Sequence, residues 1–288
     1  MRSPLFALAL VFVSLCPAFA QSDSGNTPPA VLQIHREPVR PGKLAEYTRI
    51  EAQAAQACYR ANTWPYFTMQ SITGPQEVWF VSGFETYASM ERSAEPFLRN
   101  AGLSQEMDRL AEAKANLVTE PRTVFLRYRE DLGRNHGLAH DGARFFTVTW
   151  VTVNPGRERE FEESQRMIRG VRERAGATDN RVVYQVTSGM PGNVYLIFSP
   201  YHSFLTAAQS LDELLDYDDL DDGVRSHLHD LTSVSVASVE TMVFAISPPL
   251  SNPAGEWIAD DPEFWRSSPP LQFGRVPVPL QKPAPAKK

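Results

Sequence analysis

Six side chains in β-prone stretches of the sequence have the chemistry to hold or transform a small molecule. His35 carries an imidazole, a group that accepts and donates protons near neutral pH, so it is the candidate for proton transfer. The other five carry amide, hydroxyl or aromatic groups that could hydrogen-bond a ligand or wall its pocket. The predicted site therefore consists of a catalytic His35 and five ligand-binding residues, Gln70, Trp79, Thr149, Gln185 and Tyr195.

Each of these residues also has a purely structural interpretation. A partly buried histidine or a strand glutamine can satisfy neighbouring polar groups without touching a ligand. Trp79 and Tyr195 are equally suited to a hydrophobic core, because aromatic side chains dominate core packing. Cys58 is expected to be a buried, inert thiol. Residue type alone leaves both interpretations open.

No metal site and no cofactor are predicted. His136 and His140 are four residues apart, but the glycines around them indicate a loop, where that spacing does not bring both to one face. The acidic run 212–222 lacks the residue order of a calcium-binding EF-hand loop. The sequence contains no Gly-rich phosphate loop, no G-x-S-x-G motif and no zinc-binding cysteine pattern.

An internal repeat organises the elements that would position these residues. Residues 39–47 and 153–161 both read V-x-P-G-(K/R)-x-x-E-(Y/F), offset by 114 residues (156 − 42). Each motif follows a β-prone run, 31–37 or 145–151, and precedes a helix-compatible stretch. The Pro-Gly pair predicts a sharp turn between strand and helix, because glycine tolerates backbone angles that other residues avoid.

The parallel between the two halves continues downstream. Gly- and Pro-bounded β-prone runs predict a hairpin in each half, then a helical region and a final strand. Both halves therefore read β-α-β-β-α-β, a split βαβ unit. Counting along the halves aligns Gln70 with Gln185, and an offset of 116 (194 − 78) aligns Trp79 with Tyr195. The predicted later strands are 66–73, 78–82 and 123–129 in the first half and 182–188, 194–198 and 239–246 in the second.

This pattern of strand, Pro-Gly-(Lys/Arg), helix and hairpin, with an aromatic residue on the third strand, resembles the dimeric α/β-barrel superfamily. That superfamily includes antibiotic-biosynthesis-monooxygenase-like and NIPSNAP-like domains. The resemblance covers most of residues 31–130 and 145–247. It implies an α+β fold in which two tandem ferredoxin-like βαββαβ repeats pack sheet to sheet as an intrachain pseudo-dimeric α/β barrel. In heme-degrading relatives a functional polar residue, typically Asn, lies near the position of His35, so the histidine departs from that pattern.

Alternation along the first strand of each half sorts its side chains into two faces. Leu32 and Ile34, with Phe146 and Val148, are expected under the helices. The opposite face is expected to be the one that the barrel encloses. It carries Gln33, His35 and Glu37 in the first half and Thr147, Thr149 and Val151 in the second.

The ends of the chain predict export and a separate tail. Residues 1–20 read as a bacterial signal peptide cleaved after Ala-Phe-Ala, with a lipoprotein anchored on Cys16 as the alternative. Residues 21–30 form an N-terminal arm, 131–144 a linker, and 248–288 a Pro-rich tail with aromatic anchors. The protein is thus expected to be periplasmic or secreted, without a membrane span. A net charge of −6 without a basic stripe argues against nucleic acid as a partner.

These features favour an exported protein that binds a small, largely apolar molecule in a barrel cavity, as a monomer or weak homo-oligomer. The resemblance implies an alternative, a cofactor-independent monooxygenase-like enzyme that uses His35. A second alternative is a structural or interaction protein that uses the Pro-rich tail. Whether the protein is an enzyme stays open, because fold resemblance is a weak basis for function.

Overall fold

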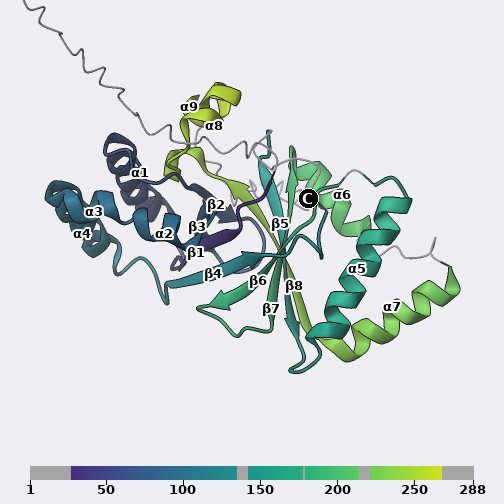
Figure 1. The fold of residues 1–288 in the computed structure, drawn as a ribbon. Helices are drawn as coiled ribbons and strands as arrows, with labels where there is room; N and C mark the ends of the chain where they lie inside the picture. Colours follow the sequence, from purple (N-terminus) through teal and green to yellow (C-terminus); the bar gives the residue numbers. More distant parts are fainter. Residues whose placement is uncertain (1–26, 135–141, 178, 214–220, 268–288) are drawn as a thin grey trace, which may run out of the picture.

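Eight strands form a closed antiparallel barrel with helices on its outside (Figure 1). The computed structural model describes residues 27–134, 142–177, 179–213 and 221–267. Around the barrel the order is β1-β3-β2-β8-β5-β7-β6-β4, and β4 pairs again with β1. All eight predicted strands are present. Their bounds are β1 Val31–Pro38, β2 Phe67–Ser71, β3 Glu77–Phe84, β4 Arg122–Tyr128, β5 Phe145–Val153, β6 Val182–Ser188, β7 Val194–Tyr201 and β8 Val236–Ile246.

Two groups of helices cover the barrel on opposite sides (Figure 1). In the first half α1 packs against α4, and in the second α5 packs against α7. The mixed α+β class is therefore confirmed, whereas the origin of the two halves by duplication stays a prediction. The helices are α1 Leu44–Arg60, α2 Tyr87–Arg92, α3 Glu95–Arg99, α4 Ala101–Lys114, α5 Glu158–Arg174, α6 Phe204–Glu213, α7 Asp222–Ser235, the 3-10 turn η1 Pro248–Leu250, α8 Gly255–Asp260 and α9 Pro262–Ser267.

The Pro-Gly motif makes the same turn in both halves. Gly42 has φ +76 and Gly156 has φ +81, in the left-handed region that favours glycine. The amide of Lys43 donates to the carbonyl of Arg40, and the amide of Arg157 donates to the carbonyl of Asn154 in the same way. Each turn redirects the chain from a strand into the first long helix of its half.

The predicted sorting of strand faces is wrong. Leu32 and Ile34, expected under the helices, lie inside the barrel together with Phe146 and Val148. His35 instead faces the helices, where it contacts Glu37 and Thr123. Alternation separates two faces but does not say which one is enclosed, and here the enclosed face carries the larger apolar residues. The correction applies equally to the other residues expected inside, Gln33, Glu37, Thr147, Thr149 and Val151.

Side chains occupy the interior of the barrel. Trp79, Met69, Leu126 and Phe244 are all completely buried within one hydrophobic cluster. An eight-stranded barrel is just wide enough for its own side chains to fill it. The predicted apolar ligand cavity in the barrel is therefore replaced by a packed core.

The C-terminal tail begins as ordered structure. Residues 248–267 form η1, α8 and α9, and Phe264 of α9 joins the hydrophobic cluster of the barrel. In the described part of the chain no helix is long and apolar enough to cross a bilayer. The predicted signal peptide, half of the linker (135–141) and residues 268–288 lie outside the described residues.

Candidate functional site

The six predicted site residues do not gather in one pocket. Trp79 lies inside the barrel, where its indole Nε1 donates to Glu77 Oε2 at 2.7 Å. Gln70 pairs with Val78, which packs under the first-half helices, so both side chains point outward. Cys58, as expected, is buried, and burial raises the pKa of its thiol. Of the six predicted residues, Trp79 thus belongs to the core, and the other five lie on the outer face of the barrel.

The predicted match between Trp79 and Tyr195 is wrong by one residue. His35 pairs with Phe80 and Thr149 pairs with Ile197, so β3 and β7 correspond at an offset of 117 (197 − 80) rather than 116. A slip of one residue moves a side chain to the other face of a sheet.

Tyr195 accordingly belongs to the outer face. It packs against Phe161 of α5 in a tilted arrangement with ring centroids 4.6 Å apart, and its hydroxyl donates to Glu162 Oε1 at 3.1 Å. Burial, with the charge of Glu162, raises the pKa of Tyr195 to about 12. The second hairpin is longer because of the extra residues in its Gly-Met-Pro-Gly turn, and for this reason the one-residue difference in offset was not recognised in the sequence.

A buried polar cluster lies between the outer face of β1 and helices α1 and α4. Glu37 is at its centre: His35 Nε2 lies 3.0 Å from Glu37 Oε1, and Tyr47 Oη donates to Oε2 at 2.5 Å. Lys114 Nζ lies 2.7 Å from Glu37 Oε1 and 2.5 Å from Glu51 Oε1. We call these five residues, His35, Glu37, Tyr47, Glu51 and Lys114, the polar cluster.

The two carboxylates of the polar cluster have opposite pKa shifts. Burial alone would raise the pKa of Glu37, but hydrogen bonds from His35, Lys114 and Tyr47 and the lysine charge lower it to about 2. Burial raises the pKa of Glu51, and Lys114 only partly offsets it. Burial would lower the pKa of Lys114, yet the two glutamates raise it. Lys114 therefore bridges the two glutamates, and Glu37 has the additional contacts with His35 and Tyr47 that keep it ionised.

The opposite shifts predict opposite results for two matched substitutions. Glu37→Gln should lower the free energy of unfolding at pH 7 by about 3 kcal/mol, because the folded pKa of about 2 lies below the ordinary 4.5. Glu51→Gln should change it by less than about 1 kcal/mol or raise it, since it removes a buried charge held by one partner. Urea unfolding of both variants measures the difference.

The pH dependence gives this prediction its sign. The stabilisation from Glu37 is complete above pH 4.5 and is lost as the pH falls towards 2. The deficit of Glu37→Gln relative to the wild type should therefore shrink in acid. An equal effect of the two substitutions at pH 7 would show that the glutamates share Lys114 evenly and would contradict this account.

The second half has no such cluster at the matching positions. Thr149 occupies the position that matches His35. Its Oγ1 lies 3.0 Å from Thr241 Oγ1 on the neighbouring strand β8. Val151 and Phe161 of the same outer layer belong to a hydrophobic cluster. The polar cluster is thus a feature of the first half, and Thr149 has no role in it.

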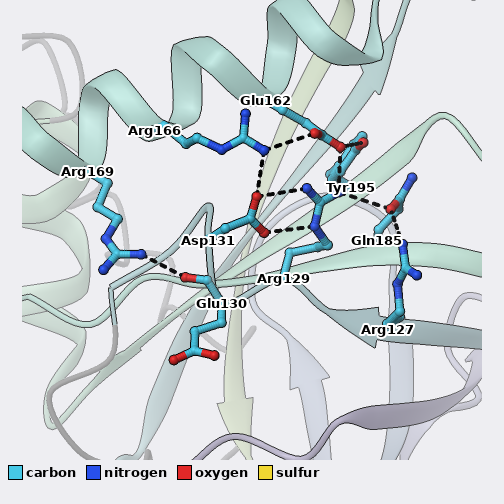
Figure 2. Close-up of polar contacts among 9 residues, drawn as sticks. All are labelled: Arg127, Arg129, Glu130, Asp131, Glu162, Arg166, Arg169, Gln185 and Tyr195. Atoms are coloured by element: carbon cyan, nitrogen blue, oxygen red, sulfur yellow. Dashed lines mark hydrogen bonds and ion pairs between the residues drawn. The ribbon is translucent and has the colours of Figure 1, made fainter.

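An open polar groove lies where the β4–β6 seam meets α5. It encloses about 870 Å³. Two predicted residues are found here, Gln185 on its wall and Tyr195 beneath it. We call it the arginine groove; it is lined by Arg127, Tyr128, Arg129, Glu130, Asp131, Glu162, Arg169 and Gln185. Figure 2 shows all of these except Tyr128.

Arg129 is fixed at the centre of the groove by carboxylates on both sides (Figure 2). Its Nε and Nη2 donate to the two oxygens of Asp131 at 2.9 and 3.0 Å, and its Nη1 donates to Glu162 Oε1 at 2.5 Å. Arg166 of α5 donates to the same pair, to Asp131 at 2.6 Å and to Glu162 at 3.1 Å. The hydrogen bonds from Arg129 hold the pKa of Asp131 down at about 2. This network ties β4 and the start of the linker to α5.

Arg127 has a different environment, two residues earlier on the same face of β4. Its Nη2 donates to Gln185 Oε1 at 3.1 Å, and Arg129 Nη1 donates to the same oxygen at 3.2 Å. Among the described residues no carboxylate forms an ion pair with Arg127. On the α5 side Arg169 donates to the main-chain oxygen of Glu130 at 3.0 Å, while the Glu130 carboxylate points away from it (Figure 2). Arg169 Nε also forms an ion pair with Glu173 at 2.8 Å, so Arg127 is the guanidinium of the two that has no carboxylate partner among the described residues.

The arginines of the groove were missed in the sequence. Arg127 and Arg129 alternate at the end of a strand, which was a visible sign of a shared face. The partner of Arg129 on α5, Glu162, comes from more than 30 residues further along the chain, and only the closed barrel brings the two together. Among the described residues no group of three His, Cys, Asp or Glu side chains is arranged to hold a metal ion.

Comparison with protein-family models and with curated protein sequences gives no match. Among solved structures, a proposed monooxygenase from Fusobacterium nucleatum has a TM-score of 0.49 at 12% identity, over 76% of this chain and 93% of that one. An anthrone oxidase-like protein has a TM-score of 0.49 at 11% identity, over 75% and 91%. A heme-binding protein from Thermus thermophilus has a TM-score of 0.41 at 7% identity, over 77% and 95%. Similarity this low says nothing about the activity of this chain.

Proposed function

We propose that this is an exported protein that binds a small organic anion in the arginine groove. The observation that carries the proposal is Arg127. Its guanidinium lines an open groove and is held by the neutral oxygen of Gln185, with no carboxylate partner among the described residues. Export rests on the signal-like residues 1–20, and a monomer or weak homo-oligomer is the expected state.

The chemistry of the groove favours an acidic ligand. A guanidinium matches a carboxylate or phosphate with two parallel N–H donors, and such charge-assisted bonds are among the strongest in proteins. Asp131 and Glu162 neutralise the charge of Arg129. Arg129 therefore acts as a fixed hydrogen-bond donor that orients Gln185. Arg127 is left to face the ligand, with Tyr128 beside it, whereas Arg169 on the α5 wall is paired with Glu173.

The proposal replaces the apolar ligand expected from the sequence with a polar one, since side chains fill the barrel. The finer picture of two tandem ferredoxin-like repeats is part of the same proposal. It is supported by the shared V-x-P-G motif, the equal turns at Gly42 and Gly156, and the common β-α-β-β-α-β order.

Calorimetric titration with benzoate, citrate and inorganic phosphate tests the site. Arg127→Gln should weaken binding of the anion that binds best by about tenfold or more, because a hydrogen bond to a charged group contributes about 1.5–3 kcal/mol. Arg122→Gln is the matched control: it removes an exposed arginine from the same strand, paired with Glu120 outside the groove. Equal affinity in both variants, or no binding of any of the three anions, would contradict the proposal.

A second candidate is a cofactor-independent, monooxygenase-like enzyme that transfers a proton through His35. The observation that favours it is the polar cluster itself, since buried charges are costly and often retained at functional sites. The His35 side chain is 37% exposed, and its Nε2 contacts the buried carboxylate of Glu37. Loss of turnover in a folded His35→Ala variant would support this function, and absence of turnover in both forms would support binding alone.

A third function, as an interaction protein that uses the Pro-rich tail, depends on residues 268–288, which lie outside the described part of the chain. Deletion of these residues tests it. A shortened protein that keeps all its partners would rule this function out.

A further inference from the structure

We propose that the mouth of the barrel beneath α9 is a second binding site, for a small aromatic carboxylate, and that the helix pair α8–α9 occupies it in the structure described here. The proposal does not depend on the arginine groove. It starts from Arg144, which precedes β5 and contacts both a ring of α9 and the carboxylate of Asp261 between α8 and α9.

Two groups of the α8–α9 pair contact Arg144, and Trp265 packs against the barrel cluster beside them. The Phe264 ring is inserted into the hydrophobic cluster of the barrel and is only 7% exposed. The guanidinium carbon of Arg144 lies 3.8 Å from the centroid of that ring. The same guanidinium forms an ion pair with Asp261, three residues earlier in the chain. A phenyl ring and a carboxylate are thus presented together to one arginine.

The mouth itself is built to receive an aromatic ring. Phe67 of β2 and Phe146 of β5 stack with centroids 5.7 Å apart and reach the cluster that receives Phe264. Aromatic pairs in offset-stacked or edge-to-face arrangements contribute about 0.5–1.5 kcal/mol beyond the area that they bury. The Arg144 side chain is 29% exposed, so its cation can be reached from solvent. Without α9, these residues would offer an aromatic pocket with a cation at its rim.

The helix pair that fills the mouth is a weak element by itself. Helices α8 and α9 have six residues each, far below the length at which isolated helices are stable. Beyond Phe264, further aromatic contacts hold them: Trp257 lies 6.4 Å from Phe67 and 5.7 Å from Trp265, between ring centroids. A ligand that supplies a ring and a carboxylate would replace both main anchors, Phe264 and Asp261. The helix pair therefore acts as a competitor within the chain.

The test uses the full chain, and calorimetry measures its affinity for the probe 3-phenylpropanoate. Phe264→Ala should bind the probe at least tenfold more tightly than the wild type, because the competing ring is gone. Adding Arg144→Leu to that variant should abolish the gain, and the neutral analogue 3-phenylpropan-1-ol should bind at least tenfold more weakly than the carboxylate. Arg127→Gln should leave this binding unchanged, which separates the mouth from the groove.

A second variant keeps the test decisive if Phe264→Ala does not fold. Asp261→Asn leaves the ring in place but releases Arg144 from its ion pair, so it should also bind the probe more tightly than the wild type. Phe161→Ala is the control, since it removes a buried ring from the separate second-half cluster. The proposal is overturned if neither Phe264→Ala nor Asp261→Asn binds the probe better than the wild type, or if Phe161→Ala shows the same gain.

Discussion

Replacing Lys114 with methionine is expected to lower the free energy of unfolding by about 3–5 kcal/mol at pH 7, because removing one partner of a buried ion pair leaves an uncompensated charge. Lys114 Nζ lies 2.7 Å from Glu37 and 2.5 Å from Glu51, and both glutamates are buried. Methionine keeps most of the length of the side chain, so the loss reports the charge rather than a cavity. Chemical denaturation monitored by circular dichroism measures it.

Lys43→Met is the matched control for this prediction. Lys43 pairs with Glu46 at 3.2 Å on the exposed surface of α1, and such pairs contribute between 0 and about 1 kcal/mol. The double variant Lys114→Met/Glu51→Gln should recover part of the loss, since one of the two stranded carboxylates is gone. A loss below about 1 kcal/mol for Lys114→Met would mean that water solvates the glutamates and that the polar cluster is not buried in solution.

The second large effect is expected at Gly189, which follows β6 at the seam with β4. Its φ of +86 is unfavourable for any side chain, and a Cβ there would lie 2.1 Å from the main-chain oxygen of Thr123. Gly189→Ala should therefore lower the free energy of unfolding by about 3 kcal/mol, the sum of a left-handed backbone cost of about 1–2 kcal/mol and an overpacking cost of about 1–3 kcal/mol. Thermal and urea unfolding measure the change.

Gly192→Ala, in the same hairpin turn, is the control for Gly189. A Cβ at Gly192 would meet nothing within 4 Å, and its φ is outside the left-handed region. This variant should match the wild type or be slightly more stable, because alanine restricts the unfolded chain. If both variants unfold alike, the β4–β6 seam is not packed as tightly as the structure indicates, and closure of the barrel comes into question.

The strands and their order along the chain could be predicted from the sequence because each is short, β-prone and bounded by Gly or Pro. The prediction of faces failed for a physical reason. Leu32 and His35 alternate on β1 whichever face is enclosed, and only the closure of the sheet through the β2–β8 and β4–β6 seams decides which. The match of Trp79 to Tyr195 failed because the sequence motif does not give the length of each hairpin. An error of one residue in the offset assigns a side chain to the opposite face of the sheet.

The candidate sites show the same division between local and long-range information. His35 and Glu37 are two residues apart on a strand, so their shared face was predictable. Lys114 joins them from a helix 77 residues further along, which no local pattern indicates. Gln185 was singled out as a polar residue recurring in a strand. Its partners Arg127 and Arg129 became visible only when β4 and β6 were paired.

Native mass spectrometry of the protein purified from its own host tests the central claim that the arginine groove binds a small organic anion. The wild type and the Arg122→Gln control should carry a small acidic molecule that is released as an anion on denaturation, and Arg127→Gln should carry little or none of it. A protein that is empty in all three forms, or one that retains a neutral or apolar molecule equally in all three, would contradict the account.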